Sequence, residues 1–223
     1  MAQVTFGLLI AILGAVAADD EQAKKSSATD QKLRKELLQR VEVDQQARGE
    51  LVKWMTEHQG QGGTAGSTGA LSAEQLAEFQ QIAARVKEAD DANTKWLRAI
   101  VEKQGWPTMT QVGEDGAGAA WLLVQHADAD PKFQRQCLDL MTKLPKDQVL
   151  GKNLAYLTDR VLLAEGKKQL YGTQFTLVDG KWIPRSLEDE ANVDKRRAEL
   201  GLPPLAEYVE QLKKAYGSGA KAK

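Results

Sequence analysis

The chain has 223 residues and a formal net charge of -1 at pH 7. This length is sufficient for one domain with a sizeable core, and the near-neutral charge argues against a nucleic-acid-binding protein, in which a basic excess is usual. Hydrophobic residues make up 42% of the chain, which excludes a disordered protein. The single cysteine, Cys137, cannot form an internal disulfide, and its helical surroundings predict a buried, unreactive thiol.

The first 18 residues have the pattern of a signal peptide. An apolar run from Val4 to Ala17 ends in the small-x-small sequence Ala15-Val16-Ala17, and an acidic stretch follows it. The run is short for a membrane span. We therefore predict that residues 1–18 direct secretion or export to the periplasm. An uncleaved anchor is the alternative, and only in that case do we expect contact with a membrane.

Residues 19–30 are predicted to be a flexible segment, residues 31–216 a single helical domain, and residues 217–223 a disordered tail. Apolar residues recur at helical spacing from Gln31 to Met55. Residues 59–70 form a Gly-rich loop without the Gly-Lys-Ser/Thr ending of a phosphate-binding loop. Ser72 then begins a capping box, which opens one long helix or two helices joined near residues 90–91.

The second half begins with a predicted turn at residues 113–118, and an apolar, central helix through Trp121 follows. Further helices are expected after Pro131, over residues 149–164, over residues 192–200 and from Leu205. Residues 169–178 have the composition of a strand, and Asp179-Gly180 is a hairpin signal before a return strand at 181–184. The predicted fold class is mainly α, a multi-helix orthogonal bundle of six to eight helices with one small β-hairpin near 169–184.

Polar residues interrupt the apolar stripes of two predicted helices. Asp44, Gln45 and Arg48 fall where the first helix should face the core, and Asp159-Arg160 interrupts the helix over 149–164. Burial of such groups is costly unless they are paired or used. A structural ion pair and a functional site are both consistent with this pattern.

The sequence Gln125-His126-Ala127-Asp128 ends the central apolar helix. We predict that the interrupting residues gather around His126 in one polar pocket, because clustered titratable groups are typical of a site. His126 would be a general base or acid, with its tautomer held by Asp128, Asp44 or Asp159. The predicted catalytic residues are His126, Asp44 and Asp159, and the predicted substrate-binding residues are Arg48, Gln125, Asp128, Arg160, Gln169, Tyr171 and Gln174.

These residues favour an exported hydrolase that acts on a polar or anionic small substrate, because the two arginines would bind an anionic group or stabilise developing negative charge. The alternative is a non-enzymatic helical module that binds a small ligand or a protein, in which the polar cluster is structural. No zincin spacing, second histidine near His126, or haem or flavin motif is present. Only a carboxylate-rich set, such as Asp128 with Asp44 or Asp159, would suit a metal, and we predict no metal and no cofactor.

Several motifs together resemble one bacterial family, known as domain of unknown function 6624. They are Arg40-Val-Glu42-Val-Asp44-Gln45-x-x-Arg48, Ala120-Trp121-x-x-Val-Gln125-His126-Ala-Asp128, Leu157-Thr158-Asp159-Arg160, Gln169-x-Tyr171-Gly172-Thr173-Gln174 and Asp194-x-x-Arg197-x-x-Leu-Gly201-Leu202. The resemblance covers Lys32 to Tyr216 apart from the Gly-rich insertion. It implies the limits of the domain, and it implies no activity, substrate or cofactor.

Overall fold

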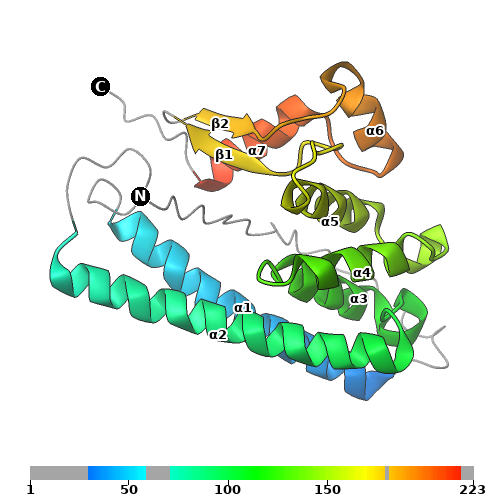
Figure 1. The fold of residues 1–223 in the computed structure, drawn as a ribbon, viewed down its shortest axis with the longest axis horizontal. Coiled ribbons are helices and arrows are strands. Elements are labelled where there is room, and N and C mark those ends of the chain that lie inside the picture. The colour runs from blue at the N-terminus through cyan, green and yellow to red at the C-terminus, as the bar shows by residue number, and fades with distance from the viewer. Residues whose placement is uncertain (1–29, 59–70, 179–180, 217–223) are drawn as a thin grey trace.

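The computed structural model describes residues 30–58, 71–178 and 181–216. In this part of the chain it has seven α-helices and one two-stranded antiparallel sheet, which confirms the predicted fold class (Figure 1). The signal peptide, the Gly-rich loop, the Asp179-Gly180 turn and the C-terminal tail of the sequence analysis lie outside the described residues. No helix in the described ranges combines the length and apolar character that a membrane span needs.

Two long helices, α1 (Gln31–Glu57) and α2 (Ala73–Gln104), form an antiparallel pair along one side of the molecule (Figure 1). Asp30 caps α1 by accepting a hydrogen bond from the Leu33 N–H at 2.9 Å. Ser72 and Gln75 form the predicted capping box of α2, which runs as one helix through residues 90–91. The two open alternatives for this region are thereby resolved in favour of a single long helix.

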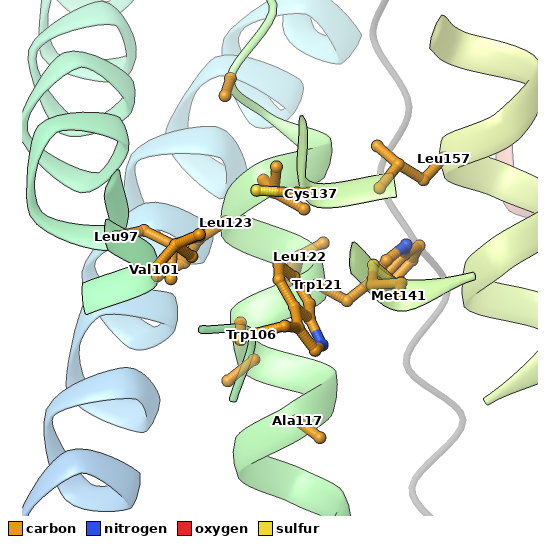
Figure 2. Packing of buried hydrophobic residues seen from close by; sticks show 14 of the residues in the cluster. Leu97, Val101, Trp106, Ala117, Trp121, Leu122, Leu123, Cys137, Met141 and Leu157 are labelled. Carbon is orange, nitrogen blue, oxygen red and sulfur yellow. The ribbon is translucent and has the colours of Figure 1, made fainter. Parts of the chain in front are cut away.

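Helix α3 (Met109–Gln125) packs against α1, α2, α4 and α5 and is the centre of the fold. Thr108 caps it together with Gln111. The predicted turn at 113–118 is wrong, because only Gly113 leaves helical geometry, with φ of 76°, and the helix resumes after this kink. Figure 2 shows Leu122 and Leu123 of α3 between Leu97 and Val101 of α2 on one side and Leu157 on the other.

Helix α4 (Pro131–Met141) starts at Pro131, as the sequence predicts, and Asp130 caps it. A short 3-10 helix, η2 (Lys146–Gln148), leads to α5 (Gly151–Ala164). Cys137 of α4 is fully buried, as predicted, and burial raises the pKa of its thiol to about 12. The thiol is therefore a packing group rather than a nucleophile.

The C-terminal part contains strands β1 (Phe175–Val178) and β2 (Lys181–Pro184), a 3-10 helix η3 (Glu190–Asn192), and helices α6 (Val193–Glu199) and α7 (Leu205–Tyr216). Phe175 pairs with Pro184 and Val178 with Lys181. The hairpin is shorter than predicted, because residues 169–174 form a loop rather than strand. Gly172 in this loop has φ of 63°, which L-residues with side chains rarely adopt.

Two clusters of buried apolar residues include parts of the α1–α2 pair. One contains Leu37, Leu97 and most of α3, and the other contains Leu51, Trp54, Ile82 and Val86. Between them both helices carry polar residues on their inner faces. The hydrophobic core is therefore interrupted at one level, and the candidate site lies there.

Candidate functional site

Three helices meet at the interruption of the core. Helix α1 contributes Asp44 and Arg48, α2 contributes Asp90, and His126 caps the C-terminus of α3. Asp44 is 1% exposed and His126 6% exposed. The predicted convergence of Asp44, Arg48 and His126, which lie far apart in sequence, is seen directly in their hydrogen bonds.

The geometry selects one tautomer of His126. Its Nδ1 lies 3.1 Å from each carboxylate oxygen of Asp44 and 3.0 Å from Nε of Arg48. A guanidinium nitrogen only donates, so Nδ1 cannot satisfy both neighbours. If Nδ1–H donates to Asp44, Arg48 Nε–H can donate to Asp44 Oδ1 at 3.2 Å, and all three groups are paired. The opposite tautomer would set a ring lone pair against two carboxylate oxygens. We therefore assign the proton to Nδ1.

The electrostatics agree with a neutral imidazole. Burial lowers the pKa of His126, Asp44 raises it, and the charge of Arg48 lowers it again, with a net downward shift. Burial alone would raise the pKa of Asp44, but its hydrogen bond to His126 and the charge of Arg48 bring it below the usual value. At neutral pH the pair is thus an ionised Asp44 and a neutral His126 with a lone pair on Nε2.

His126 Nε2 has no hydrogen-bond partner among the described residues, and it is fully shielded from solvent. Buried polar atoms in folded proteins are nearly always paired, so each exception needs an explanation. In this tautomer the unpaired atom is an acceptor. The arrangement, a histidine held at Nδ1 by a carboxylate and free at Nε2, is that of a general base.

Asp90 belongs to the site although the sequence analysis did not select it. Its carboxylate accepts a short hydrogen bond from Nη2 of Arg48. Burial raises the pKa of Asp90 to about 7, against the opposing effect of Arg48. A signal was present in the sequence, because Asp90 continues the apolar stripe of Ile82 and Val86 at helical spacing.

A second ion pair forms the outer part of the site. Arg160 of α5 donates through Nη1 to both oxygens of Asp128, at 2.5 and 2.6 Å. The Asp128 side chain is 53% exposed, whereas that of Arg160 is 9% exposed. Gln134 of α4, also missed from the sequence, donates from Nε2 to Asp128 Oδ1 at 3.2 Å. Exposure thus increases from His126 outward to Asp128, which marks the side nearest to solvent.

Gln125, the other predicted site residue at this end of α3, has a buried side chain without hydrogen-bond partners among the described residues. It is 1% exposed, yet neither its amide oxygen nor its amide nitrogen has a partner among the described residues.

Two surface hollows of about 420 Å³ lie elsewhere, along the outer face of α2 and beside Trp106. No residue of the site lines either of these hollows.

Asp44, Asp90 and His126 also have the composition of a cation site, since each offers a ligand atom within 4.8 Å of the others. The guanidinium of Arg48, however, hydrogen-bonds both carboxylates, and its Nε lies 3.0 Å from His126 Nδ1. It already supplies the positive charge that two buried carboxylates require. A metal ion would fit this set only if Arg48 left it, so no step of the chemistry below uses one.

Asp159 was predicted to share a pocket with His126, but its carboxylate binds the loop before β1 instead. Its carboxylate accepts hydrogen bonds from the backbone N–H groups of Leu170, Tyr171 and Thr173, at 2.7, 2.9 and 2.8 Å. No described hydrogen bond joins it to His126, whose Nδ1 is held by Asp44 instead. Among the three carboxylates considered for the tautomer of His126, the structure selects Asp44.

Gln169, Tyr171 and Gln174 also belong to the loop before β1. The Gln169 side chain donates to the carbonyls of Gln174 and Arg185 and accepts from the Gln174 N–H at 3.0 Å. The Gln174 amide donates to Thr173 Oγ1 at 3.0 Å. These groups hold the loop onto the hairpin, and their contacts do not reach the His126 group.

The comparisons with known proteins concern the family alone. Residues 31–221 match the family described as "Family of unknown function (DUF6624)". The chain belongs to this family. Neither the curated proteins nor the solved structures contain a match. The DUF6624 assignment confirms the resemblance drawn from the sequence motifs, and it brings no activity with it. The function of this DUF6624 domain must therefore be argued from the site.

Proposed function

We propose that this DUF6624 protein is a hydrolase that acts on a polar or anionic small substrate, with His126 as its general base. One observation carries the proposal: the neutral His126 is held at Nδ1 by both oxygens of Asp44, while its buried Nε2 is unpaired. A carboxylate behind a histidine fixes the tautomer and stabilises the imidazolium that forms when Nε2 takes a proton.

In the proposed reaction, Nε2 removes a proton from a water molecule as the resulting hydroxide attacks the substrate. The bond to the leaving group breaks, and the proton on Nε2 passes to that group, which returns the histidine to its starting state. Arg48 acts through Asp44, since its guanidinium hydrogen-bonds Asp44 and Asp90. Arg48 is thus a positioning residue here, rather than the substrate-binding residue that the sequence suggested.

The second predicted function, a non-enzymatic module with a structural polar cluster, is supported by Asp159 and Gln169. Asp159 and Gln169 satisfy backbone groups of the 169–174 loop. This role accounts for those residues without any ligand. It does not account for the unpaired Nε2 of His126, and for this reason we favour the hydrolase.

A screen of small ester, amide and phosphoester substrates on the wild type and the His126→Ala variant tests the proposal. His58→Ala is the matched control, because His58 is the other histidine and stacks on Trp54 at the end of α1. We expect His126→Ala to lower kcat about 100-fold or more, and His58→Ala to retain the wild-type rate. Equal turnover by wild type and His126→Ala would remove His126 from the mechanism.

A further inference from the structure

Unpaired buried polar atoms are concentrated around the C-terminal end of α3. Within the described residues, six buried side-chain atoms have no partner: Trp121 Nε1, both amide atoms of Gln125, His126 Nε2, Arg160 Nε and Arg197 Nη2. All but the last belong to the C-terminal half of α3, to its C-cap His126, or to Arg160 of α5. Because leaving such atoms unpaired costs stability, their concentration at one place indicates a ligand-binding function.

The spacing of these residues places them on facing helix surfaces. Trp121 and Gln125 are one turn apart on α3, and Tyr156 and Arg160 are one turn apart on α5. The rings of Trp121 and Tyr156 meet edge to face, with their centroids 6.0 Å apart. One turn further along α5, Arg160 binds Asp128, which lies three residues beyond the end of α3. Gln125 therefore lies between these two contacts, on the same side of α3 as Trp121.

The unpaired groups are mostly donors. Trp121 Nε1 and Arg160 Nε can only donate, and the Gln125 amide nitrogen donates as well. Asp128 already balances the charge of Arg160 through Nη1. A set of N–H donors with little net charge suits a planar carbonyl or carboxyl oxygen better than a phosphate, whose charge would remain uncompensated.

We propose that Trp121, Gln125 and Arg160 bind the oxygen of a small carboxamide or carboxylate group beside His126. This inference rests on the proposed function and names its substrate class: a small amide or ester, whose hydrolysis yields a carboxylic acid. Water loses a proton to His126 Nε2, hydroxide adds to the carbonyl carbon, and the C–N or C–O bond breaks. The proton on Nε2 then passes to the leaving amine or alcohol. The N–H donors receive the carbonyl oxygen as it gains negative charge.

Two buried glutamines at this end of α3 provide a matched test. Gln125 and Gln134 are each 1% exposed, but the Gln134 amide nitrogen donates to the Val124 carbonyl and to Asp128. Gln125→Met removes unpaired polar atoms, and we expect a higher urea midpoint of unfolding. Gln134→Met leaves the Val124 carbonyl without this donor, and we expect a lower midpoint. A lower midpoint for Gln125→Met would show that its amide is paired, which would overturn the proposal.

Binding is measured by NMR on the indole N–H of Trp121, which is assigned among the five tryptophans by Trp121→Phe. Acetate and acetamide are the probes, and methylammonium, which has no acceptor, is the control. We expect both probes to shift this signal in the wild type, and Gln125→Met to weaken their affinity about tenfold. An unshifted signal in the wild type, or equal affinity in Gln125→Met, would overturn the proposal.

The two proposals fail in different ways. His126→Gln should keep the acetamide-induced shift and lose turnover, because His126 transfers the proton while the α3–α5 donors bind the oxygen. If the wild type binds acetamide and His126→Ala retains full turnover, the general base is wrong and the binding site stands. If His126→Ala loses turnover and no probe shifts the indole signal, the binding site is wrong and the general base stands.

Discussion

Asp90 shows how strongly one side chain depends on its surroundings. The charge of Arg48 favours the ionised form of the Asp90 carboxyl. Its burial and the negative charges of Asp44 and Asp128 disfavour that form. Burial has the larger effect, and the pKa of Asp90 rises from 3.8 to about 7. The charge at the edge of the site therefore changes near neutral pH.

This shift predicts a pH dependence of stability. Between pH 3.8 and about 7 the folded protein holds a proton on Asp90 that the unfolded chain has released. The free energy of unfolding should consequently fall as pH rises through this window. In Asp90→Asn this contribution is absent, so its urea midpoint should decline less from pH 4 to pH 7 than that of the wild type. Asp91→Asn, at an exposed residue paired with Lys87, should keep the wild-type slope. Parallel profiles for wild type and Asp90→Asn would contradict the assignment.

At the level of single residues, helical periodicity was a good guide to burial and a poor guide to partners. Asp44 and Arg48 were predicted to face the core because they fall on the stripe of Leu37 and Leu51, and both are buried. The same reasoning applied to α2 would have found Asp90. Which carboxylate holds His126 could not be predicted, because that depends on how α1 and α3 cross.

In the second half of the chain, buried charged side chains bind the backbone of the loop at residues 169–174. Asp159 on α5 binds three N–H groups of the 169–174 loop, and Arg197 on α6 donates to the carbonyls of Tyr171 and Pro203. The loop is thus held between a carboxylate and a guanidinium. Gln169 forms a single backbone bridge to Leu187, but the N–H groups of Leu170, Tyr171 and Thr173 bond the Asp159 side chain instead of a neighbouring strand. The predicted strand from residue 169 therefore does not form.

Asp159→Asn tests whether the hydrogen bonds of Asp159 to the 169–174 loop are independent of the His126 group. The amide can accept fewer of the three N–H bonds, and we expect a loss of about 1–3 kcal/mol in the free energy of unfolding. Amide hydrogen exchange of Leu170, Tyr171 and Thr173 should accelerate. Asp139→Asn, on the exposed face of α4, should change neither quantity. A shift of the His126 ring signals in Asp159→Asn, with unchanged exchange in the loop, would join Asp159 to the site after all.

Over the whole molecule, the fold class, the capping box at Ser72 and the core stripes were predicted from the sequence, because they follow from local periodicity and capping chemistry. The division of the core into two clusters could not be predicted from the sequence. The cluster around Leu37 and Leu97 and the cluster around Leu51 and Val86 are separated by the Asp44–Arg48–Asp90–His126 network. That separation arises only when α1 and α2 pair in register and α3 inserts its C-terminus between their polar stretches.

A network in this position gives up apolar contact that the two clusters could otherwise share. Replacing a complete buried ionic group with apolar side chains of similar size is often neutral or stabilising, whereas removing one member leaves an uncompensated charge. Asp44→Ala should therefore lower the free energy of unfolding by about 3–5 kcal/mol, since it leaves the Arg48 Nε and the His126 Nδ1–H without this acceptor.

The combined variant Asp44→Leu/Arg48→Met/Asp90→Leu/His126→Leu should instead unfold at the same urea concentration as the wild type or a higher one, with a gain of up to about 4 kcal/mol. It would join the two clusters into one continuous core and abolish catalysis. Urea unfolding of the wild type, Asp44→Ala and the combined variant in one buffer compares their free energies of unfolding. If the combined variant is no more stable than Asp44→Ala, the network is required for packing, and its charged groups serve the structure rather than the chemistry of His126.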